Sequence, residues 1–241
     1  MQLDNKVAVV TGASAGIGAA IATELARAGA RLVLTGRRED RLQEVARSIG
    51  TDCVILAADI ADPSTPERLL QLAQDRFGQS DIVINNAGVL TVGPLETIDL
   101  DELSQMIRIN FEAVVRSSYV FARVFKAQKS GAIINLSSIG AYLTASMGGV
   151  YGGLKQALDT FTQALRIELA GTGVKVGSIA PGTTQTEIFR DMRARGEKGW
   201  DEYIATPLQG EDIAAAVRFM LEQPDRATVA RLLLVSSDDA H

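Results

Sequence analysis

The chain has almost no histidine and almost no cysteine. His241, the last residue, is the single histidine, and Cys53 is the single cysteine. A lone cysteine excludes an intramolecular disulfide, and the sequence has no cluster of cysteine and histidine residues that would bind a metal. Cys53 lies in an apolar run, which favours a packing role for it. If this protein moves protons, a side chain other than histidine must carry them.

An excess of basic charge is also missing. The 24 lysines and arginines are outnumbered by 29 aspartates and glutamates, which gives a net charge of −5. This balance argues against nucleic acid as a partner, because phosphate backbones select basic surfaces. No apolar run approaches the ~20 residues of a membrane span, and the N-terminus lacks a signal-peptide pattern. We therefore expect a cytoplasmic protein that has no membrane partner.

Apolar, β-branched runs alternate with segments of helical periodicity along the whole chain. The runs are continuous rather than alternating, which is typical of parallel strands buried on both faces, and the helical segments supply the crossovers. The sequence thus predicts an α/β fold with a doubly wound parallel sheet of seven strands, which binds ligands at the carboxyl ends of its strands. The predicted strands are Val7 to Val10, Arg31 to Leu34, Cys53 to Leu56, Ile82 to Ile84, Ala132 to Leu136, Val174 to Ile179 and Leu232 to Val235.

The sequence shows no linker, repeat or low-complexity segment, so residues 1–241 are predicted to form one domain. The one irregular stretch runs from Gly182 to Gly210, and it carries aromatic and charged side chains together. Long irregular excursions often cover a binding site, which predicts a substrate lid at 183–209.

A glycine-rich segment follows the first predicted strand and precedes a predicted helix. Such glycines allow a tight turn, close approach of the backbone to a pyrophosphate, and close packing of the helix whose N–H groups face the anion. A glycine triplet alone is a weak signal, but this one lies in the first strand-to-helix turn. We expect the cofactor contacts Gly12, Ser14, Ala15, Gly16, Ile17 and Gly18 here.

Tyr151 and Lys155 lie four positions apart at the start of a predicted helix. Residues so spaced are neighbours on one helical face, and a nearby ammonium favours the phenolate and lowers the pKa of a tyrosine. This pair is suited to acid–base chemistry without histidine. The alternative is a core tyrosine and a surface lysine, but Gly152 and Gly153 argue against it, because glycine in a helix start suggests close approach of backbone or ligand.

These motifs occur together in an order that closely resembles the short-chain dehydrogenase/reductase family, in its compact single-domain branch. The resemblance rests on TGxxxGxG at Thr11 to Gly18 and on the YxxxK pair, and it extends from about Lys6 to Thr186. Further matching positions are Asn85, Asn86, Ala87, Gly88, Asn110, Ser138, Pro181 and Gly182.

The resemblance implies four catalytic residues. Tyr151 is the general acid or base, Lys155 also holds the nicotinamide ribose, and Ser138 hydrogen-bonds the substrate oxygen. Asn110 bends its helix, predicted from Leu100 to Phe125, and holds a water that relays protons to the lysine. Two alternatives remain: Ser137 is the rival for the hydroxyl role, and Asn110 is otherwise a satisfied polar group of the core.

The resemblance also implies a set of cofactor contacts beyond the glycine-rich segment. Asp59, which precedes Ile60, matches the acid that contacts the adenine; alternatively it caps the helix after Pro63. The remaining implied contacts are Ile60, Asn86, Ala87, Gly88, Tyr151, Lys155, Pro181, Gly182, Thr184 and Thr186.

Two arginines after the second strand indicate which nicotinamide cofactor is used. An enzyme that uses NAD would carry an acid there to bind the ribose 2′-hydroxyl. Here the chain has Arg37 and Arg38, whose guanidiniums attract a 2′-phosphate, and Glu39 and Asp40 come late, where acids stabilise a helix start. We predict NADP(H) as the cofactor, with Arg37 as its principal contact, and no metal; otherwise both arginines are solvated.

The resulting hypothesis is an NADP-dependent oxidoreductase that acts on a carbonyl or alcohol small molecule and assembles as a homotetramer or a homodimer. The alternative is a non-catalytic NADP sensor or scaffold on the same fold. The tail from Ala227 to His241, together with Pro181 to Thr184, resembles the branch that contains clavulanic acid dehydrogenase and the 3-hydroxy acid and serine dehydrogenases. An apolar substrate pocket is expected from Tyr142, Leu143, Met147, Phe189, Met192 and Trp200, whereas Arg190, Arg193 and Arg195 either attract an acidic substrate or, as we prefer, form an exposed, charge-balanced lid helix.

Overall fold

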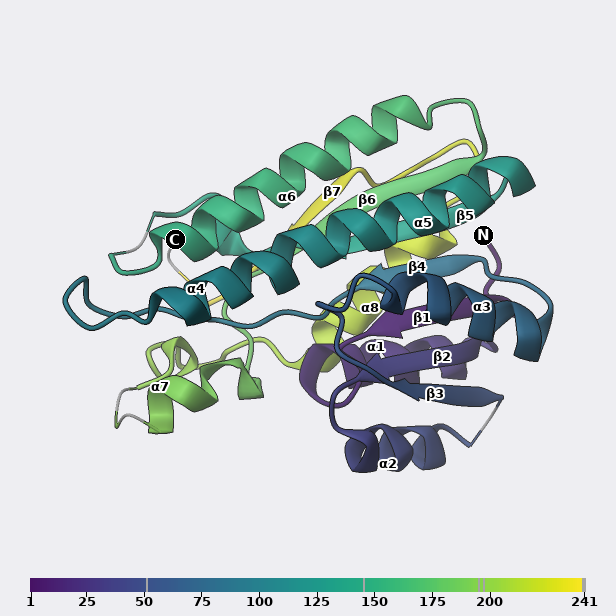
Figure 1. The fold of residues 1–241 in the computed structure, drawn as a ribbon. Coiled ribbons are helices and arrows are strands. Elements are labelled where there is room, and N and C mark those ends of the chain that lie inside the picture. Colours follow the sequence, from purple (N-terminus) through teal and green to yellow (C-terminus); the bar gives the residue numbers. More distant parts are fainter. Residues whose placement is uncertain (51, 145, 195, 197, 240–241) are drawn as a thin grey trace.

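The computed structural model describes residues 1–50, 52–144, 146–194, 196 and 198–239. Its centre is a seven-stranded sheet of parallel strands in the order β3-β2-β1-β4-β5-β6-β7 (Figure 1). Strand β1 pairs with both β2 and β4, so the strand order reverses beside it. The strands are β1 Val7–Thr11, β2 Arg31–Gly36, β3 Cys53–Ala57, β4 Ile82–Asn85, β5 Gly131–Leu136, β6 Val174–Pro181 and β7 Arg231–Leu234.

The predicted doubly wound sheet is confirmed, and the strand ends differ from the predicted ones by one or two residues. Strands β1, β4 and β5 are buried along their whole length, as expected from their continuous apolar runs. Strand β7 alternates between exposed and half-buried residues, because it forms the edge of the sheet beyond β6.

Helices cover both faces of the sheet. On one face α1, α2 and α8 pack against alternate strand residues, and on the other face α3, α5 and α6 pack against the remaining ones. Each helix places an apolar stripe against the sheet, as its 3.6-residue period requires. Their bounds are α1 Gly16–Arg27, α2 Glu39–Ile49, α3 Thr65–Phe77, α5 Ala113–Gln128, α6 Gly149–Glu168 and α8 Gly210–Glu222.

The helix predicted from Leu100 to Phe125 has three parts. Helix α4 (Leu100–Ile107) is capped by Asp99, whose carboxylate accepts hydrogen bonds from two backbone N–H groups of the first turn. A π-helical turn, η1 (Arg108–Glu112), then leads into α5. In Figure 1 the three parts run as one long rod across the sheet. A π turn inside a helix is rare and often occurs at functional sites.

The irregular segment between β6 and α8 is built of short turns, namely η3 (Glu187–Phe189), α7 (Arg190–Ala194) and η4 (Trp200–Glu202). Figure 1 shows α7 set apart from the sheet below α4. Phe189 and Met192 of this segment join a separate apolar cluster with Met106 and Tyr151, which docks the segment onto α4 and α6. Within the described residues, no helix has the length and apolar character needed to cross a bilayer.

Candidate active site

A cavity of about 1130 Å³ lies at the carboxyl ends of the strands, beside β1 and β4, where the strand order reverses. Ligands of doubly wound folds bind at this point of the sheet. Every residue that the sequence predicted for catalysis or cofactor binding lines this cavity. They are Gly12, Ser14, Ala15, Gly16, Ile17, Gly18, Arg37, Arg38, Asp59, Ile60, Asn86, Ala87, Gly88, Asn110, Ser138, Tyr151, Lys155, Pro181, Gly182, Thr184 and Thr186.

The glycine-rich segment forms a tight cradle between β1 and α1. Gly12 has a φ of +67°, and a Cβ atom there would lie 2.8 Å from the Cα of Ala87. A Cβ on Gly18 would lie 2.3 Å from the carbonyl oxygen of Gly12, so α1 packs directly on the turn. The first turn of α1 has no acidic residue, and its N-terminal N–H groups favour an anion. This cradle fits the pyrophosphate of a dinucleotide.

The two arginines at the end of β2 occupy different surroundings. The Arg38 guanidinium donates to the Glu187 carboxylate at 2.7 Å and to the Ser14 hydroxyl at 3.3 Å. Arg37 is exposed at the cavity wall. Arg38 therefore links the glycine-rich segment to the segment that follows β6, whereas Arg37 presents its charge to the cavity mouth.

Asp59 does not cap the helix that follows it. The N-cap of α3 is Ser64, and the Asp59 carboxylate instead accepts a hydrogen bond from the Ala61 N–H at 2.9 Å. The alternative capping role is therefore wrong, because the helix begins six residues beyond Asp59. The aspartate side chain lies in a local turn at the cavity wall.

Asn110 is completely buried in the π-helical turn. Its side-chain oxygen accepts from the Val89 N–H at 2.9 Å, and its amide nitrogen donates to the Val89 carbonyl at 2.8 Å. Both ends of the amide are thus satisfied by the backbone that follows β4, which fits the alternative of a satisfied core group. The implied water relay stays a prediction.

Tyr151, Ser138 and Lys155 meet at the middle of the cavity. The Ser138 hydroxyl and the Tyr151 ring both lie against Gly140, and Ser138 opposes the rise in the Tyr151 pKa. The Lys155 ammonium lies 5.7 Å from the centre of the Tyr151 ring and donates to the Leu136 carbonyl at 2.7 Å. Ser137 instead points its hydroxyl to the Lys155 carbonyl, so the structure places Ser138, and not its rival, beside the phenol.

Burial governs the protonation of this pair. It raises the pKa of Tyr151, and Ser138 opposes that rise. The direction is opposite to the lowering expected from Lys155, because desolvation of the phenolate outweighs an ammonium that bonds the Leu136 carbonyl. Burial also lowers the pKa of Lys155 to about 8, against the effect of the Asp159 carboxylate.

The two glycines after Tyr151 differ. A Cβ on Gly152 would lie 2.7 Å from the carbonyl oxygen of Gly140, in the turn that follows Ser138, whereas a Cβ on Gly153 would meet nothing within 4 Å. The predicted close approach of backbone is therefore found at Gly152, whereas no protein atom comes close to Gly153. Gly152 lets α6 contact η2 (Ile139–Ala141).

The end of the cavity beyond Tyr151 is partly apolar. Leu143, Phe189 and Trp200 line it as expected, and the two aromatic rings of this set pack 5.9 Å apart. The other three expected residues do not line it: Tyr142 bonds Asp159, Met147 is exposed, and Met192 is buried in the cluster beneath. The sequence did not predict the lining residues Thr144, Glu187, Tyr203, Ile204, Asp238 and Asp239.

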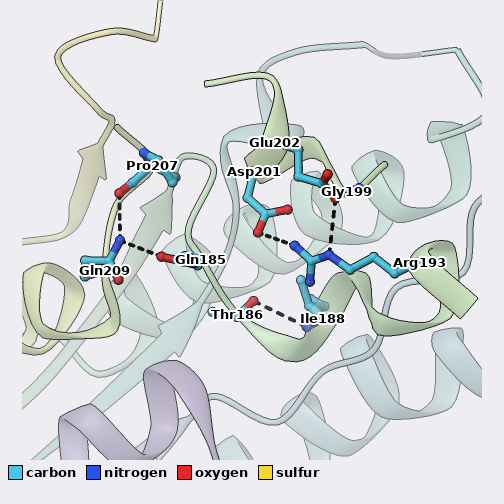
Figure 2. Close-up of polar contacts among 9 residues, drawn as sticks. All are labelled: Gln185, Thr186, Ile188, Arg193, Gly199, Asp201, Glu202, Pro207 and Gln209. Atoms are coloured by element: carbon cyan, nitrogen blue, oxygen red, sulfur yellow. Dashed lines mark hydrogen bonds and ion pairs between the residues drawn. The ribbon is translucent and has the colours of Figure 1, made fainter. Parts of the chain in front are cut away.

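Arg193, in the segment between β6 and α8, follows the charge-balanced interpretation. Figure 2 shows Arg193 pointing between Asp201 and Glu202, with which it forms ion pairs. Arg190 lines the cavity, and Arg195 lies outside the described residues. Hydrogen bonds from Gln185 to Leu208 and from Gln209 to Gln185 join the two ends of the segment between β6 and α8, and the second is visible in Figure 2. No group of three or more metal-ligating side chains occurs among the described residues.

Comparison with known proteins places the chain among oxidoreductases. The family model for short chain dehydrogenases matches residues 6–197. An uncharacterized oxidoreductase of Staphylococcus aureus is 38% identical over 228 residues, which cover 94% of this chain and 95% of the relative. An uncharacterized oxidoreductase of Staphylococcus epidermidis is 37% identical over 228 residues, which cover 95% and 96%.

Solved structures show the same fold with nucleotide bound. The closed form of serine dehydrogenase complexed with NADP+ matches with a TM-score of 0.90 and 30% identity, covering 98% of this chain and 96% of that one. An alcohol dehydrogenase from the archaeon Thermococcus sibiricus, complexed with 5-hydroxy-NADP, matches with a TM-score of 0.87 and 30% identity, covering 99% of both chains.

Proposed function

The chain belongs to the short-chain dehydrogenase family, and on that premise we propose that it is an NADP-dependent oxidoreductase acting on a carbonyl or secondary alcohol group. The observation that carries the proposal is the meeting of Ser138, Tyr151 and Lys155 in the cavity that the glycine cradle also lines. When bound, the nicotinamide supplies or accepts the hydride.

The roles of the side chains follow from their protonation. Because burial raises the pKa of Tyr151, the phenol is protonated at neutral pH and is ready to donate its proton to a carbonyl oxygen during reduction. Ser138 donates a hydrogen bond to the same oxygen. The Lys155 ammonium stabilises the phenolate that remains, and in the direction of alcohol oxidation that phenolate is the base.

The proposed cofactor contacts each bind a different part of the dinucleotide. The glycine cradle at Gly12 and Gly18 binds the pyrophosphate, Arg37 is the principal contact of the 2′-phosphate, and Asp59 contacts the adenine. A guanidinium matches a phosphate in charge and geometry, and a ribose hydroxyl gains little from it. The two solved relatives named above were captured with NADP+ and with an NADP derivative, which supports the same choice.

A substrate with both apolar and polar parts suits the cavity, whose lining includes the apolar Leu143 and Trp200 and the charged Arg190 and Asp238. Hydroxy acids and amino hydroxy acids have this character, and one solved relative is a serine dehydrogenase.

A substrate panel tests the proposal. Ketones, aldehydes and oxo acids are offered with NADPH, and alcohols, hydroxy acids and serine with NADP+, while cofactor absorbance and product formation are followed. We expect turnover on at least one compound class. Tight NADPH binding without turnover of any panel member would favour the alternative of a non-catalytic sensor or scaffold.

We also propose that the protein assembles as a homotetramer, as the family resemblance implies, or failing that as a homodimer. Ile167 of α6, Phe219 of α8 and Leu233 of β7 are large apolar side chains exposed on the single chain, which supports contacts between copies. Light scattering at working concentration should give a mass of about four or two times 25.6 kDa. A mass of one chain would contradict the proposal.

A further inference from the structure

The helical face that carries Tyr151 and Lys155 continues by one turn to Asp159. The three side chains stand at intervals of four residues on α6, and their exposed fractions are 9%, 6% and 4%. A carboxylate buried this deeply is costly unless other charges and hydrogen bonds compensate it.

The compensation comes from two other elements. The Tyr142 hydroxyl donates to Asp159 Oδ2 at 2.5 Å, and the Arg231 Nε atom of β7 lies 3.8 Å from the same oxygen. The Arg231 guanidinium also lies over the Tyr142 ring, 5.6 Å from its centre. Asp159 Oδ1 is buried and has no hydrogen-bond partner among the described residues. The carboxylate is therefore only half satisfied by its neighbours.

Asp159 also acts on Lys155, which precedes it by one turn on α6. The Asp159 charge opposes the fall in the Lys155 pKa that burial causes. Because Arg231 of β7 lies beside the same carboxylate, it reduces the negative potential that Asp159 creates at Lys155. The titratable Tyr151 stands one turn before Lys155 on the same helix.

Tyr142 gives Asp159 a second connection to the site. It is the residue that ends η2, the turn whose N-cap is Ser138. Its bond to Asp159 therefore ties the segment that presents Ser138 to the helix that presents Tyr151.

We propose that Asp159 is a positioning residue for the Tyr151–Lys155 pair: its carboxylate keeps Lys155 charged within the buried site and, through Tyr142, holds the Ser138 segment against α6. The effect on the charge of Lys155 is a property of the ligand-free protein. Only the effect on turnover rests on the proposed function.

Titration of Lys155 in the ligand-free protein tests the electrostatic part. Lysine labelled with carbon-13 at Cε is followed by NMR, and the Lys155 signal is assigned by its loss in Lys155→Arg. Asp159→Asn should lower the pKa of Lys155 by on the order of one unit from its value of about 8, because the ammonium loses its compensating charge. Arg231→Gln should raise it by a few tenths of a unit, since a nearby positive charge is removed.

Two further variants separate charge from structure. Asp159→Glu keeps the charge and should restore the wild-type pKa to within a few tenths. Glu168→Gln makes the same charge change at the exposed end of α6 and should leave the pKa of Lys155 unaltered. An unchanged Lys155 pKa in Asp159→Asn would overturn the proposal. If Asp159→Asn fails to fold, a Lys155 pKa that falls or stays unchanged in Arg231→Gln would overturn the proposal instead.

The pH dependence of kcat/KM tests the consequence for turnover once a substrate is known. In Asp159→Asn the alkaline limb should move to lower pH by the same amount as the Lys155 pKa, because the lysine loses its charge earlier. Tyr142→Phe keeps the carboxylate, so it should lower kcat several-fold without moving that limb. A purely structural role would lower the melting temperature and leave the limb in place, which would contradict the proposal. A wild-type enzyme without turnover would count against the proposed function but would not affect the titration result.

Discussion

The buried face of α6 and the segment between β6 and α8 both carry charged side chains, but the surroundings of these charges differ. On α6 the charges of Lys155 and Asp159 are buried against few partners. Between β6 and α8, the side chains of Arg193 and Glu202 are 40% and 41% exposed and pair with each other, and Arg193 also pairs with the buried Asp201. Exposed pairs are screened by water and salt, whereas buried charges depend strongly on each neighbour.

The difference predicts where substitutions matter. Tyr151 and Lys155 lie on a 20-residue helix that packs against the sheet, so their geometry is fixed by the core. The lid consists of short turns docked by Phe189 and Met192. We expect single substitutions at the centre of the cavity to have large effects on activity. Substitution of the exposed arginine that is proposed to bind the cofactor phosphate should have an intermediate effect, and substitutions between β6 and α8 should have small effects.

Tyr151→Phe should have the largest effect. It removes the proton donor and almost none of the cavity wall, so kcat should fall by roughly a thousandfold or more while NADPH affinity stays nearly unchanged. Steady-state kinetics and fluorescence titration with NADPH measure the two quantities. Lys155→Ala is the matched comparison, and it should damage both turnover and NADPH binding. Substantial activity in the phenylalanine variant would show that another group supplies the proton.

Arg37→Ala should come next. A charge-assisted hydrogen bond to a phosphate is worth roughly 1.5 to 3 kcal/mol, so the Michaelis constant for NADPH should rise about ten- to a hundredfold. The constant for NADH should hardly change. Arg38→Ala should have a smaller effect, because that guanidinium is bonded to Glu187 and Ser14. An equal rise for both cofactors in Arg37→Ala would show that Arg37 does not contact the phosphate.

Gly152→Ala and Gly153→Ala form a matched pair on the reaction helix. The first places a Cβ 2.7 Å from the Gly140 carbonyl and must shift the Ser138 turn, so kcat should fall by about tenfold. The second meets open space and should leave kcat unchanged while raising the melting temperature slightly, because alanine favours the helix. Equal kcat values in the two variants would mean that the contact between α6 and η2 does not position Ser138.

Glu202→Gln should have the smallest effect. The ion pair of Glu202 with Arg193 is exposed on both sides, so its removal should lower the melting temperature by no more than about 2 °C. Calorimetry at low and high salt checks this, and the difference from the wild type should shrink at high salt. A loss of stability that persists at high salt would show that the charges between β6 and α8 are as poorly screened as the buried charges on α6.

The parts of the molecule that sequence predicts well are those set by local constraints. Continuous apolar runs such as Ile82–Asn85 indicate buried strands without knowledge of their partners. The glycine cradle is similar, since Gly12 needs a positive φ and leaves no room for a Cβ. Most of the predicted site residues follow from these elements, because they lie at or just beyond the end of a predicted strand or at the start of a predicted helix, whereas Asn110 lies inside one.

The parts that sequence does not predict depend on packing between distant segments. Asp238 and Asp239 line the cavity because the tail after β7 returns to it, and no local pattern indicates that return. The rise in the Tyr151 pKa depends on burial, which the tyrosine–lysine spacing alone does not fix. Similarly, Gly152 and Gly153 look alike in the sequence, and only the position of the Gly140 carbonyl distinguishes them.

Transfer of deuterium from NADPH that carries deuterium at both positions of the reactive ring carbon tests the central claim most directly. Wild-type protein and Tyr151→Phe, both shown by titration to bind NADPH, are incubated with a carbonyl compound that the panel identifies, and the products are analysed by mass spectrometry. The account predicts one deuterium on the carbinol carbon of the wild-type product and almost no product from the variant. Equal product from both proteins, or an unlabelled alcohol from the wild type, would contradict it.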